Sequence, residues 1–197
     1  MSDKVLRIGG ASGFWGDAAR ATPQLLAAGN LDYIVYDYLA EITMSIMARA
    51  RVKDDSLGYA TDFLSAAMKP NLKVIAQQGV KIISNAGGVN PQACAVALRQ
   101  MIAEQDLSLT VACVTGDDLL PAAEQLKASG VQEMFSGEAF PAVDKLLSVN
   151  AYLGAFPVAE ALAQGADIVV TGRCVDSAVT PVSYTHLTLP TTWSRCW

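Results

Sequence analysis

The feature of this chain that most constrains its fold is a repeated pairing of a short apolar run with a polar loop. Each of five apolar runs is followed by a loop of glycine, asparagine, aspartate or other small polar residues, and a helix-like stretch follows each loop. The runs span residues 5–8, 33–36, 81–83, 109–114 and 168–170. Such alternation is typical of parallel βα units. We therefore predict an α/β fold with an open, mostly parallel sheet of about five strands, helices on both faces and Rossmann-like layering.

Length, charge and cysteine content narrow the class of protein. The 197 residues are 52% hydrophobic, which suits one α/β domain with a buried core. Fourteen basic residues are scattered among 19 acidic ones, a balance that disfavours binding to a nucleic-acid backbone. The apolar runs are too short to cross a membrane, and no signal-peptide pattern is visible. Because the four cysteines form no CxxC pair, we expect a reduced, cytoplasmic setting. The polar loops after the apolar runs lead us to expect a small-molecule partner.

The composition changes sharply near the C-terminus. The segment from Val182 onward contains no acidic residue and the only histidine, His186. Its stretch VSYTHLTLPT resembles the translation of a transposase-type sequencing adapter. We therefore expect one domain over residues 1–180 and a non-native tail over residues 181–197, which would leave no native histidine for catalysis.

Capping residues predict where several helices begin. Asparagine, aspartate and threonine side chains accept hydrogen bonds from the first amides of a helix, and proline is favoured in the first turn. The expected starts are Thr22 with Pro23, Asn90 with Pro91, and Asp117 or Asp118 ahead of Pro121.

A glycine-rich loop after the first run offers one candidate ligand site. Gly10, Gly13 and Gly16 form GxxGxxG, and Asp37 lies 21 residues past Gly16 at the end of the second run. This spacing resembles a dinucleotide fingerprint, so a nicotinamide-dependent oxidoreductase is one alternative. The fingerprint, however, needs its loop to open a helix, and the helix start expected at Thr22 lies well past Gly16. A different small-ligand site is favoured, with a plain structural turn as the remaining alternative.

Charged residues after the strands offer candidate chemistry. Asp17, Asp37 and Glu41 follow the first two runs and could transfer protons or bind Mg²⁺, although Asp17 also suits a loop cap. Arg173 and Asp176 follow the fifth run, where the guanidinium could bind a carboxylate or phosphate and the carboxylate could act as a base. The simpler alternative is a local ion pair between them.

Amides, a thiol and aromatic rings complete the candidates. Asn85 and Gly87 lie where amide groups could meet a carbonyl or phosphate oxygen, and Asp117 follows the fourth run. Cys174 could be a nucleophile of lowered pKa, but it has no native histidine partner. Tyrosines near the second run, with Phe14 and Trp15, could line an apolar pocket. The candidate catalytic residues are Asp17, Asp37 and Asp176, and the candidate ligand-binding residues are Gly10, Gly13, Gly16, Asn85, Gly87, Asp117 and Arg173.

The candidate residues include no metal ligands and do not identify a cofactor. Zinc is disfavoured by the lack of native histidine and of paired cysteines. If the candidates form one site, Asp17, Asp37, Asn85, Asp117 and Arg173 should gather at one edge of the sheet.

Four long blocks of the sequence together resemble the acyclic terpene utilisation (AtuA-like) family. The blocks are IGGASGFWGD at residues 8–17, LDYIVYDYLAEITMSIMARA at 31–50, SNAGGVNP at 84–91 and GADIVVTGRCVDSA at 165–178. The resemblance implies a role in the bacterial catabolism of acyclic terpenoids such as citronellol and geraniol, alongside acyl-CoA carboxylation. Members of that family continue beyond this point, so the chain resembles an N-terminal fragment.

The resemblance transfers no catalytic residue and no reaction type. The expected substrate is a terpenoid acid or its acyl-CoA. A nicotinamide-dependent oxidoreductase and a noncatalytic partner subunit of a carboxylase pathway are the alternatives, and assembly into a homo-oligomer stays open.

Overall fold

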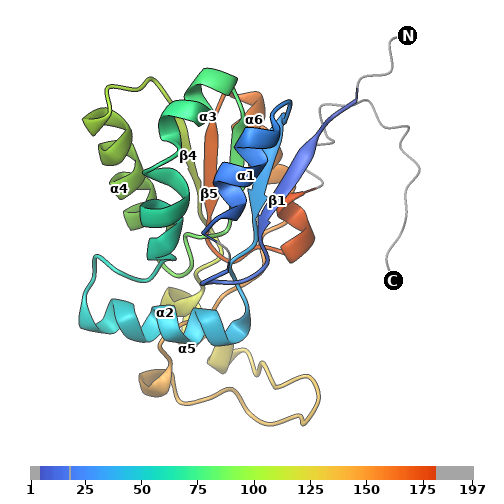
Figure 1. The fold of residues 1–197 in the computed structure, drawn as a ribbon. Coiled ribbons are helices and arrows are strands. Elements are labelled where there is room, and N and C mark those ends of the chain that lie inside the picture. The colour runs from blue at the N-terminus through green and yellow to red at the C-terminus, as the bar shows by residue number, and fades with distance from the viewer. Residues whose placement is uncertain (1–4, 18, 181–197) are drawn as a thin grey trace.

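Five short strands form one parallel sheet in the computed structural model, which describes residues 5–17 and 19–180 (Figure 1). The strands are β1 (Ile8–Ser12), β2 (Tyr33–Tyr36), β3 (Lys81–Ser84), β4 (Val111–Val114) and β5 (Ile168–Thr171). Their order across the sheet is β1-β2-β3-β5-β4, and every neighbouring pair is parallel. The predicted α/β fold with a five-stranded parallel sheet is confirmed.

The central strands are buried on both faces, which explains their nearly continuous apolar sequences. All four residues of β2 and of β5 are buried, as expected where helices cover both sides of a parallel sheet. Tyr36 pairs with Ser84, and Ser84 pairs with Val170. This register brings the residues that follow β2, β3 and β5 out at the same edge.

One face of the sheet is covered by most of the helices. The elements that contribute to its core are α1 (Ala21–Ala28), α2 (Glu41–Lys53), the π-helix η1 (Phe63–Met68), α3 (Leu72–Gln78) and α4 (Pro91–Glu104). Leu26, Phe63 and Leu98 pack there against Ile34 and Ile82. Helix α2 runs across the carboxyl edge of the sheet rather than along a strand (Figure 1).

The other face is covered by α6 (Phe156–Ala163), whose Val158 and Leu162 pack with Val169 of β5. The strand order explains this division. The connections from β1 to β4 all progress in one direction across the sheet, whereas the connection from β4 to β5 turns back. Because crossovers between parallel strands are right-handed, reversing the direction moves the helix to the opposite face.

The chain leaves the neighbouring strands β3 and β5 toward opposite faces. After β3 it enters α4 in the first core, whereas after β5 it enters the short helix η4 (Asp176–Val179), whose Ala178 and Val179 belong to the second core. In open α/β sheets, ligands usually bind at the carboxyl ends of strands whose connections diverge in this way, so the ends of β3 and β5 are where a ligand is expected.

The expected start of α4 is confirmed, and that of α1 is wrong. Asn90 precedes α4, and its side chain accepts a hydrogen bond from the Ala93 amide at 3.3 Å. Helix α1 begins at Ala21, two residues before the expected first helical residue, Pro23. The Thr22 hydroxyl instead hydrogen-bonds the buried Tyr36 hydroxyl at 2.9 Å, so a tertiary contact takes the group that could have capped the helix.

The region after β4 is largely irregular. The 3₁₀ turn η2 (Leu120–Ala122) and α5 (Ala123–Ala128) follow Leu119 and Ala122, so neither Asp117 nor Asp118 is the expected N-cap, although Asp118 Oδ1 accepts from the Leu120 amide. The 3₁₀ turn η3 (Val143–Lys145) interrupts the long loop that leads back to α6. The expected non-native tail lies outside the described residues. Across residues 5–17 and 19–180, no helix has the length and hydrophobicity to cross a membrane.

Candidate functional site

The glycine loop after β1 does not open a helix. Gly10 lies within β1, Gly13 and Gly16 lie in the loop, and α1 begins only at Ala21. Gly16 has a φ of 88°, which favours glycine, and its amide donates to Asp62 Oδ2 at 3.3 Å. In a dinucleotide fingerprint this amide would face a pyrophosphate at a helix N-terminus. The geometry here differs from that arrangement.

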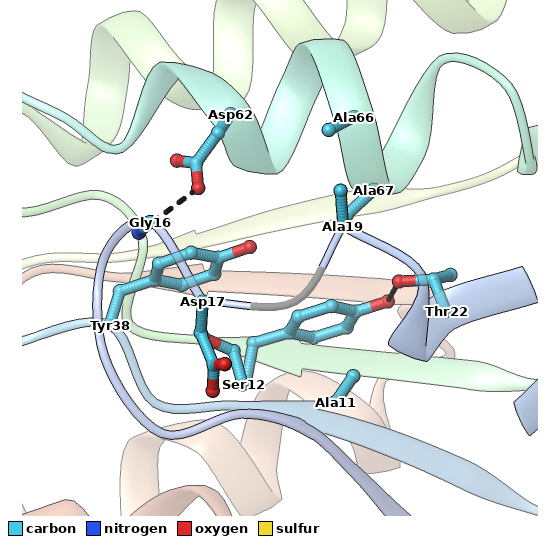
Figure 2. A pocket seen from close by; sticks show the side chains of 11 residues that line it. Ala11, Ser12, Gly16, Asp17, Ala19, Thr22, Tyr38, Asp62, Ala66 and Ala67 are labelled. Carbon is cyan, nitrogen blue, oxygen red and sulfur yellow. Dashed lines mark hydrogen bonds between the residues drawn. The ribbon is translucent and has the colours of Figure 1, made fainter. Parts of the chain in front are cut away.

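Asp17 lies beside this loop and not in the main polar cluster (Figure 2). Its Oδ2 accepts a hydrogen bond from the Gly13 amide at 2.9 Å, so Asp17 caps the loop, as the simpler alternative predicts. Asp17 also lines a cavity of about 230 Å³ together with Tyr36, Tyr38 and Asp62. Tyr36 and Tyr38, two of the tyrosines predicted to line a pocket, therefore line this cavity beside Asp17.

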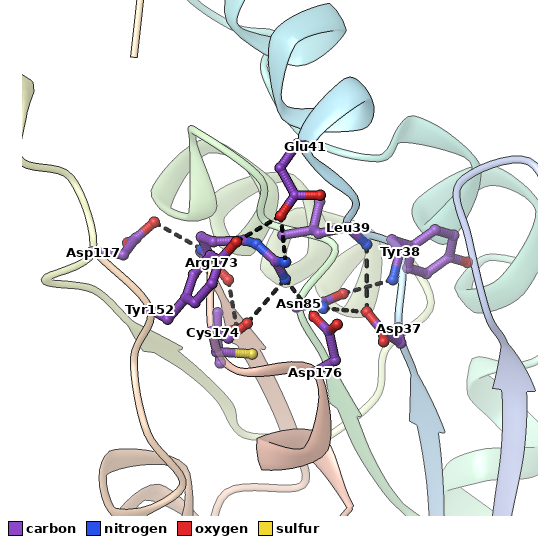
Figure 3. A network of polar contacts seen from close by, with 12 residues as sticks. Asp37, Tyr38, Leu39, Glu41, Asn85, Asp117, Tyr152, Arg173, Cys174 and Asp176 are labelled. Carbon is purple, nitrogen blue, oxygen red and sulfur yellow. Dashed lines mark hydrogen bonds and ion pairs between the residues drawn. The ribbon is translucent and has the colours of Figure 1, made fainter. Parts of the chain in front are cut away.

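The main polar cluster begins at the ends of β2 and β3 (Figure 3). Asn85, which follows β3 and is fully buried, donates from Nδ2 to Asp37 Oδ1 at 2.6 Å. Its Oδ1 accepts from the Tyr38 amide at 2.7 Å. Asn85 therefore fixes both the backbone after β2 and the orientation of the Asp37 carboxylate.

Asp37 has the properties of a proton-transfer group. Burial raises the pKa of its carboxyl, and the negative charge of Asp176 raises it further, whereas the Asn85 hydrogen bond opposes the change. The Leu39 amide also donates to Oδ1, at 3.4 Å. Among the described residues no hydrogen-bond donor contacts Asp37 Oδ2, so this oxygen remains available to a ligand.

Arg173 follows β5, and its side chain contacts the remaining residues of the cluster. Its side chain is only 5% exposed, yet its guanidinium donates to Asp176 Oδ1 at 2.6 Å and to the Cys174 carbonyl at 3.0 Å. Burial alone lowers the pKa of Arg173, but the interactions with Asp176 and Tyr152 together outweigh it, so the net change is upward. The predicted local pair with Asp176 is present.

Glu41 and Tyr152 close the cluster from the outside. Glu41 Oε1 lies 3.4 Å from Arg173 Nη2, and the Tyr152 hydroxyl donates to the same oxygen at 2.6 Å. The Arg173 guanidinium carbon lies 4.3 Å from the centre of the Tyr152 ring, in cation–π geometry. The hydrogen bond from Tyr152 lowers the pKa of Glu41. Sequence reasoning missed Tyr152, because it lies in an irregular loop that carries no motif.

Asp117 and Gly87 hold the loops that follow β3 and β5. Asp117 Oδ2 accepts from the Arg173 amide at 2.7 Å and from Asn150 Nδ2 at 2.9 Å. Burial raises the pKa of Asp117, whereas these hydrogen bonds lower it. The Gly87 amide donates to the Thr171 carbonyl at 3.1 Å. Both groups therefore already have partners within the fold, in positions that shape the loops.

Cys174 does not have a lowered pKa. It is fully buried, and burial raises the pKa of its thiol. The expected helix N-terminus does not compensate, because the short helix η4 begins two residues later at Asp176. A nucleophilic role is therefore not favoured by its surroundings.

The cluster carries more negative than positive charge. Arg173 is the one cation that contacts it among the described residues, against the carboxylates of Asp37, Asp176 and Glu41. Within the same described part of the chain, no three metal-binding side chains are grouped to hold an ion, so the Mg²⁺ hypothesis gains no support.

The predicted site residues thus fall into two neighbouring groups at one edge of the sheet. Asp37, Asn85, Asp117, Arg173 and Asp176 lie together at the carboxyl ends of the strands β2 to β5 (Figure 3). Asp17 and Gly16 line the separate cavity near β1. Tyr38 belongs to both, since its amide contacts Asn85 and its ring lines the cavity.

Comparison with known proteins identifies the family. The family model described as "Acyclic terpene utilisation family protein AtuA" matches residues 6–188, which includes the start of the segment that we expect to be non-native. No curated protein and no solved structure matches the chain. The family match covers every strand of the sheet and both groups of site residues. The chain therefore belongs to the acyclic terpene utilisation family AtuA.

Proposed function

We propose that this protein is a cytoplasmic enzyme of bacterial acyclic terpenoid catabolism that acts on the CoA thioester of a terpenoid acid. Family membership supports the role in acyclic terpene utilisation. The observation that carries the catalytic part is the half-buried Asp37 carboxylate, which has a raised pKa and lies at the carboxyl end of β2, beside Asn85.

The reaction that suits this site is proton transfer at the carbon next to the thioester carbonyl. Asp37 Oδ2 accepts the proton, the C–H electron pair moves into the developing enolate, and the same carboxyl returns the proton in the reverse step. A carboxyl of raised pKa is a better base than an ordinary exposed one. Arg173, with Nη2 only loosely held by Glu41, supplies donors for the negative charge that develops on the carbonyl oxygen.

Charge favours a thioester over the free acid as the substrate. A terpenoid carboxylate would add a negative charge beside Asp37, Asp176 and Glu41, whereas Arg173 is already paired with two of them. Like charges at such distances in a half-buried site repel strongly. The carbonyl of a thioester is neutral and meets no such repulsion.

The test is deuterium exchange into citronellyl-CoA in D₂O, followed by mass spectrometry. We expect the protein to catalyse exchange at the carbon next to the carbonyl, and Asp37→Asn to slow it by about 100-fold or more, as for the loss of a general base. Asp106→Asn is the matched control, because Asp106 is exposed and follows α4, at the opposite edge of the sheet.

Two results would overturn the proposal. One is a wild-type protein that binds citronellyl-CoA without exchanging its protons. The other is an Asp37→Asn variant that exchanges as fast as the Asp106→Asn control.

A further inference from the structure

The guanidinium of Arg173, which the proposed reaction uses to hold the carbonyl oxygen, is almost completely covered by its neighbours (Figure 3). Nη1 donates to Asp176 Oδ1 at 2.6 Å and to the Cys174 carbonyl at 3.0 Å. Nη2 contacts Glu41 Oε1 at 3.4 Å, the longest of these three contacts. The centre of the Tyr152 ring lies 4.3 Å from the guanidinium carbon. A ligand oxygen can therefore bind Nη2 only if the side chains that cover it move.

The two covering side chains can move while their backbones stay in place. The amides on either side of Tyr152 donate to the carbonyls of Asp117 and Arg173, at 2.8 and 3.1 Å. Glu41 is the first residue of helix α2. In contrast to these anchored backbones, Tyr152 is 54% exposed and the Glu41 side chain 79%. Exposed side chains change rotamer rapidly, so rotation of these two is enough to uncover Nη2.

The contact between Glu41 and Arg173 is one that a ligand can replace. An exposed ion pair contributes little to stability, because water solvates both charges when the pair opens. Arg173 also keeps a charge partner when Glu41 leaves, since Asp176 stays bonded to Nη1. The Tyr152 hydroxyl holds the Glu41 carboxylate in place by donating to Oε1 at 2.6 Å. The two side chains therefore act together: the hydroxyl holds the carboxylate, and the carboxylate covers Nη2.

We propose that Glu41 and Tyr152 form a gate over Arg173, in which the Glu41 carboxylate holds the position at Nη2 that the carbonyl oxygen of the thioester takes on binding. This inference rests on the proposed function, because that function supplies the ligand oxygen. On binding, Glu41 rotates into solvent, the Tyr152 hydroxyl loses its acceptor, and Nη2 donates to the carbonyl oxygen. The gate regulates the site by competition, because only a ligand that binds Arg173 better than Glu41 does can open it.

Chemical modification tests the gate without any thioester. Phenylglyoxal modifies arginine side chains that solvent can reach, and peptide mass spectrometry locates the modified residue. Glu41→Gln keeps the size of the side chain but removes the charge that holds it at Nη2. We expect Arg173 to react about two- to fivefold faster in this variant, as the loss of an exposed ion pair predicts.

The same digests contain the controls. Arg99 of α4, which donates to the Val111 carbonyl, is the internal reference and should react at the wild-type rate in every variant. Glu104→Gln, an exposed change at the last residue of α4, is the matched control. An Arg173 rate that is the same in Glu41→Gln and Glu104→Gln would overturn the gate.

Calorimetric titration with citronellyl-CoA tests the competition. We expect Kd to be about two- to fivefold lower for Glu41→Gln than for wild type, with Glu104→Gln unchanged. Tyr152→Phe keeps the ring on Arg173 but removes the hydroxyl that holds Glu41. It should therefore lower Kd in the wild-type background and less in the Glu41→Gln background, because the two side chains act together.

The titration separates failure of the gate from failure of the proposed function. A Glu41→Gln variant that binds citronellyl-CoA no more tightly than wild type would overturn the gate and leave the proposed function in place. A wild-type protein that binds no citronellyl-CoA would overturn the proposed function and, with it, the assignment of the ligand oxygen to Nη2.

Discussion

At the scale of single residues, Asp37 is a half-buried carboxylate, and its burial destabilises the fold once the carboxylate is ionised. Burial raises the pKa of its carboxyl above the ordinary value of 3.8. A carboxyl whose pKa is raised on folding binds protons more tightly in the native state. It therefore stabilises the fold at low pH, and that contribution is lost as the pH rises through the raised pKa.

This sign leads to a prediction for the stability of Asp37→Asn. The amide keeps the acceptor that Asn85 and Leu39 use but does not ionise. We expect Tm of the variant, relative to wild type, to rise between about pH 4 and pH 7, because only the wild type must bury a charge there. Thermal melts across this range measure it, with Asp106→Asn as a control whose difference from wild type should change less. A constant difference for Asp37→Asn would mean that the pKa of Asp37 is not raised.

Gly87 is one of the glycines where packing leaves no room for a side chain. A Cβ on Gly87 would lie 2.6 Å from the Pro91 Cβ and would also collide with the Thr171 carbonyl, whereas a Cβ on Gly10 would meet no atom within 4 Å. We expect Gly87→Ala to lower the free energy of unfolding by about 1–3 kcal/mol, as overpacking does, and Gly10→Ala to change it much less. Urea unfolding compares the two. Equal effects would show that the loop after β3 adjusts freely.

At the scale of secondary-structure elements, the start of α4 fixes the loop that follows β3. The Asn90 side chain caps the helix and also donates to the carbonyls of Asp55 and Leu57. Asn90→Ala should lower the free energy of unfolding by about 2–3 kcal/mol, from the lost cap and two lost hydrogen bonds. Gln92→Ala, an exposed change in the first turn of the same helix, should have little effect in the same urea experiment. A similar loss in both variants would exclude capping as the cause.

Which elements the sequence predicts depends on where their determining contacts lie. Asn90 caps α4 through local hydrogen bonds, so its role was visible from the order NP alone. Thr22 was assigned wrongly because its partner, Tyr36, is on another element. Tyr152 reaches Glu41 and Arg173 from an irregular loop, and no local pattern encodes such a contact.

At the scale of the whole molecule, parallel strands made part of the site predictable. Asp37 and Asn85 follow neighbouring strands, so their contact comes directly from the sheet. The position of β5 between β3 and β4 could not be inferred, because apolar runs do not encode strand order. That position brings Arg173 close enough to Asp37 for its charge to act on the Asp37 carboxylate.

The same architecture gives a prediction for nicotinamide cofactors. The loop after β1 ends well before α1, and the Gly16 amide already donates to Asp62. We expect no binding of NAD(H) or NADP(H) at millimolar concentration when nucleotide fluorescence is followed. Saturable binding that is lost in a Gly13→Val variant would restore the oxidoreductase alternative.

The most direct test of the account is to locate a bound thioester by NMR on ¹⁵N-labelled protein titrated with citronellyl-CoA. The account predicts that the largest amide shifts occur at Leu39, Asn85 and Arg173, at the carboxyl ends of β2, β3 and β5, with little change at Lys81 and Asp167 on the opposite edge of the sheet. Shifts confined to that opposite edge, or to the cavity near Asp62, would contradict a catalytic site at Asp37.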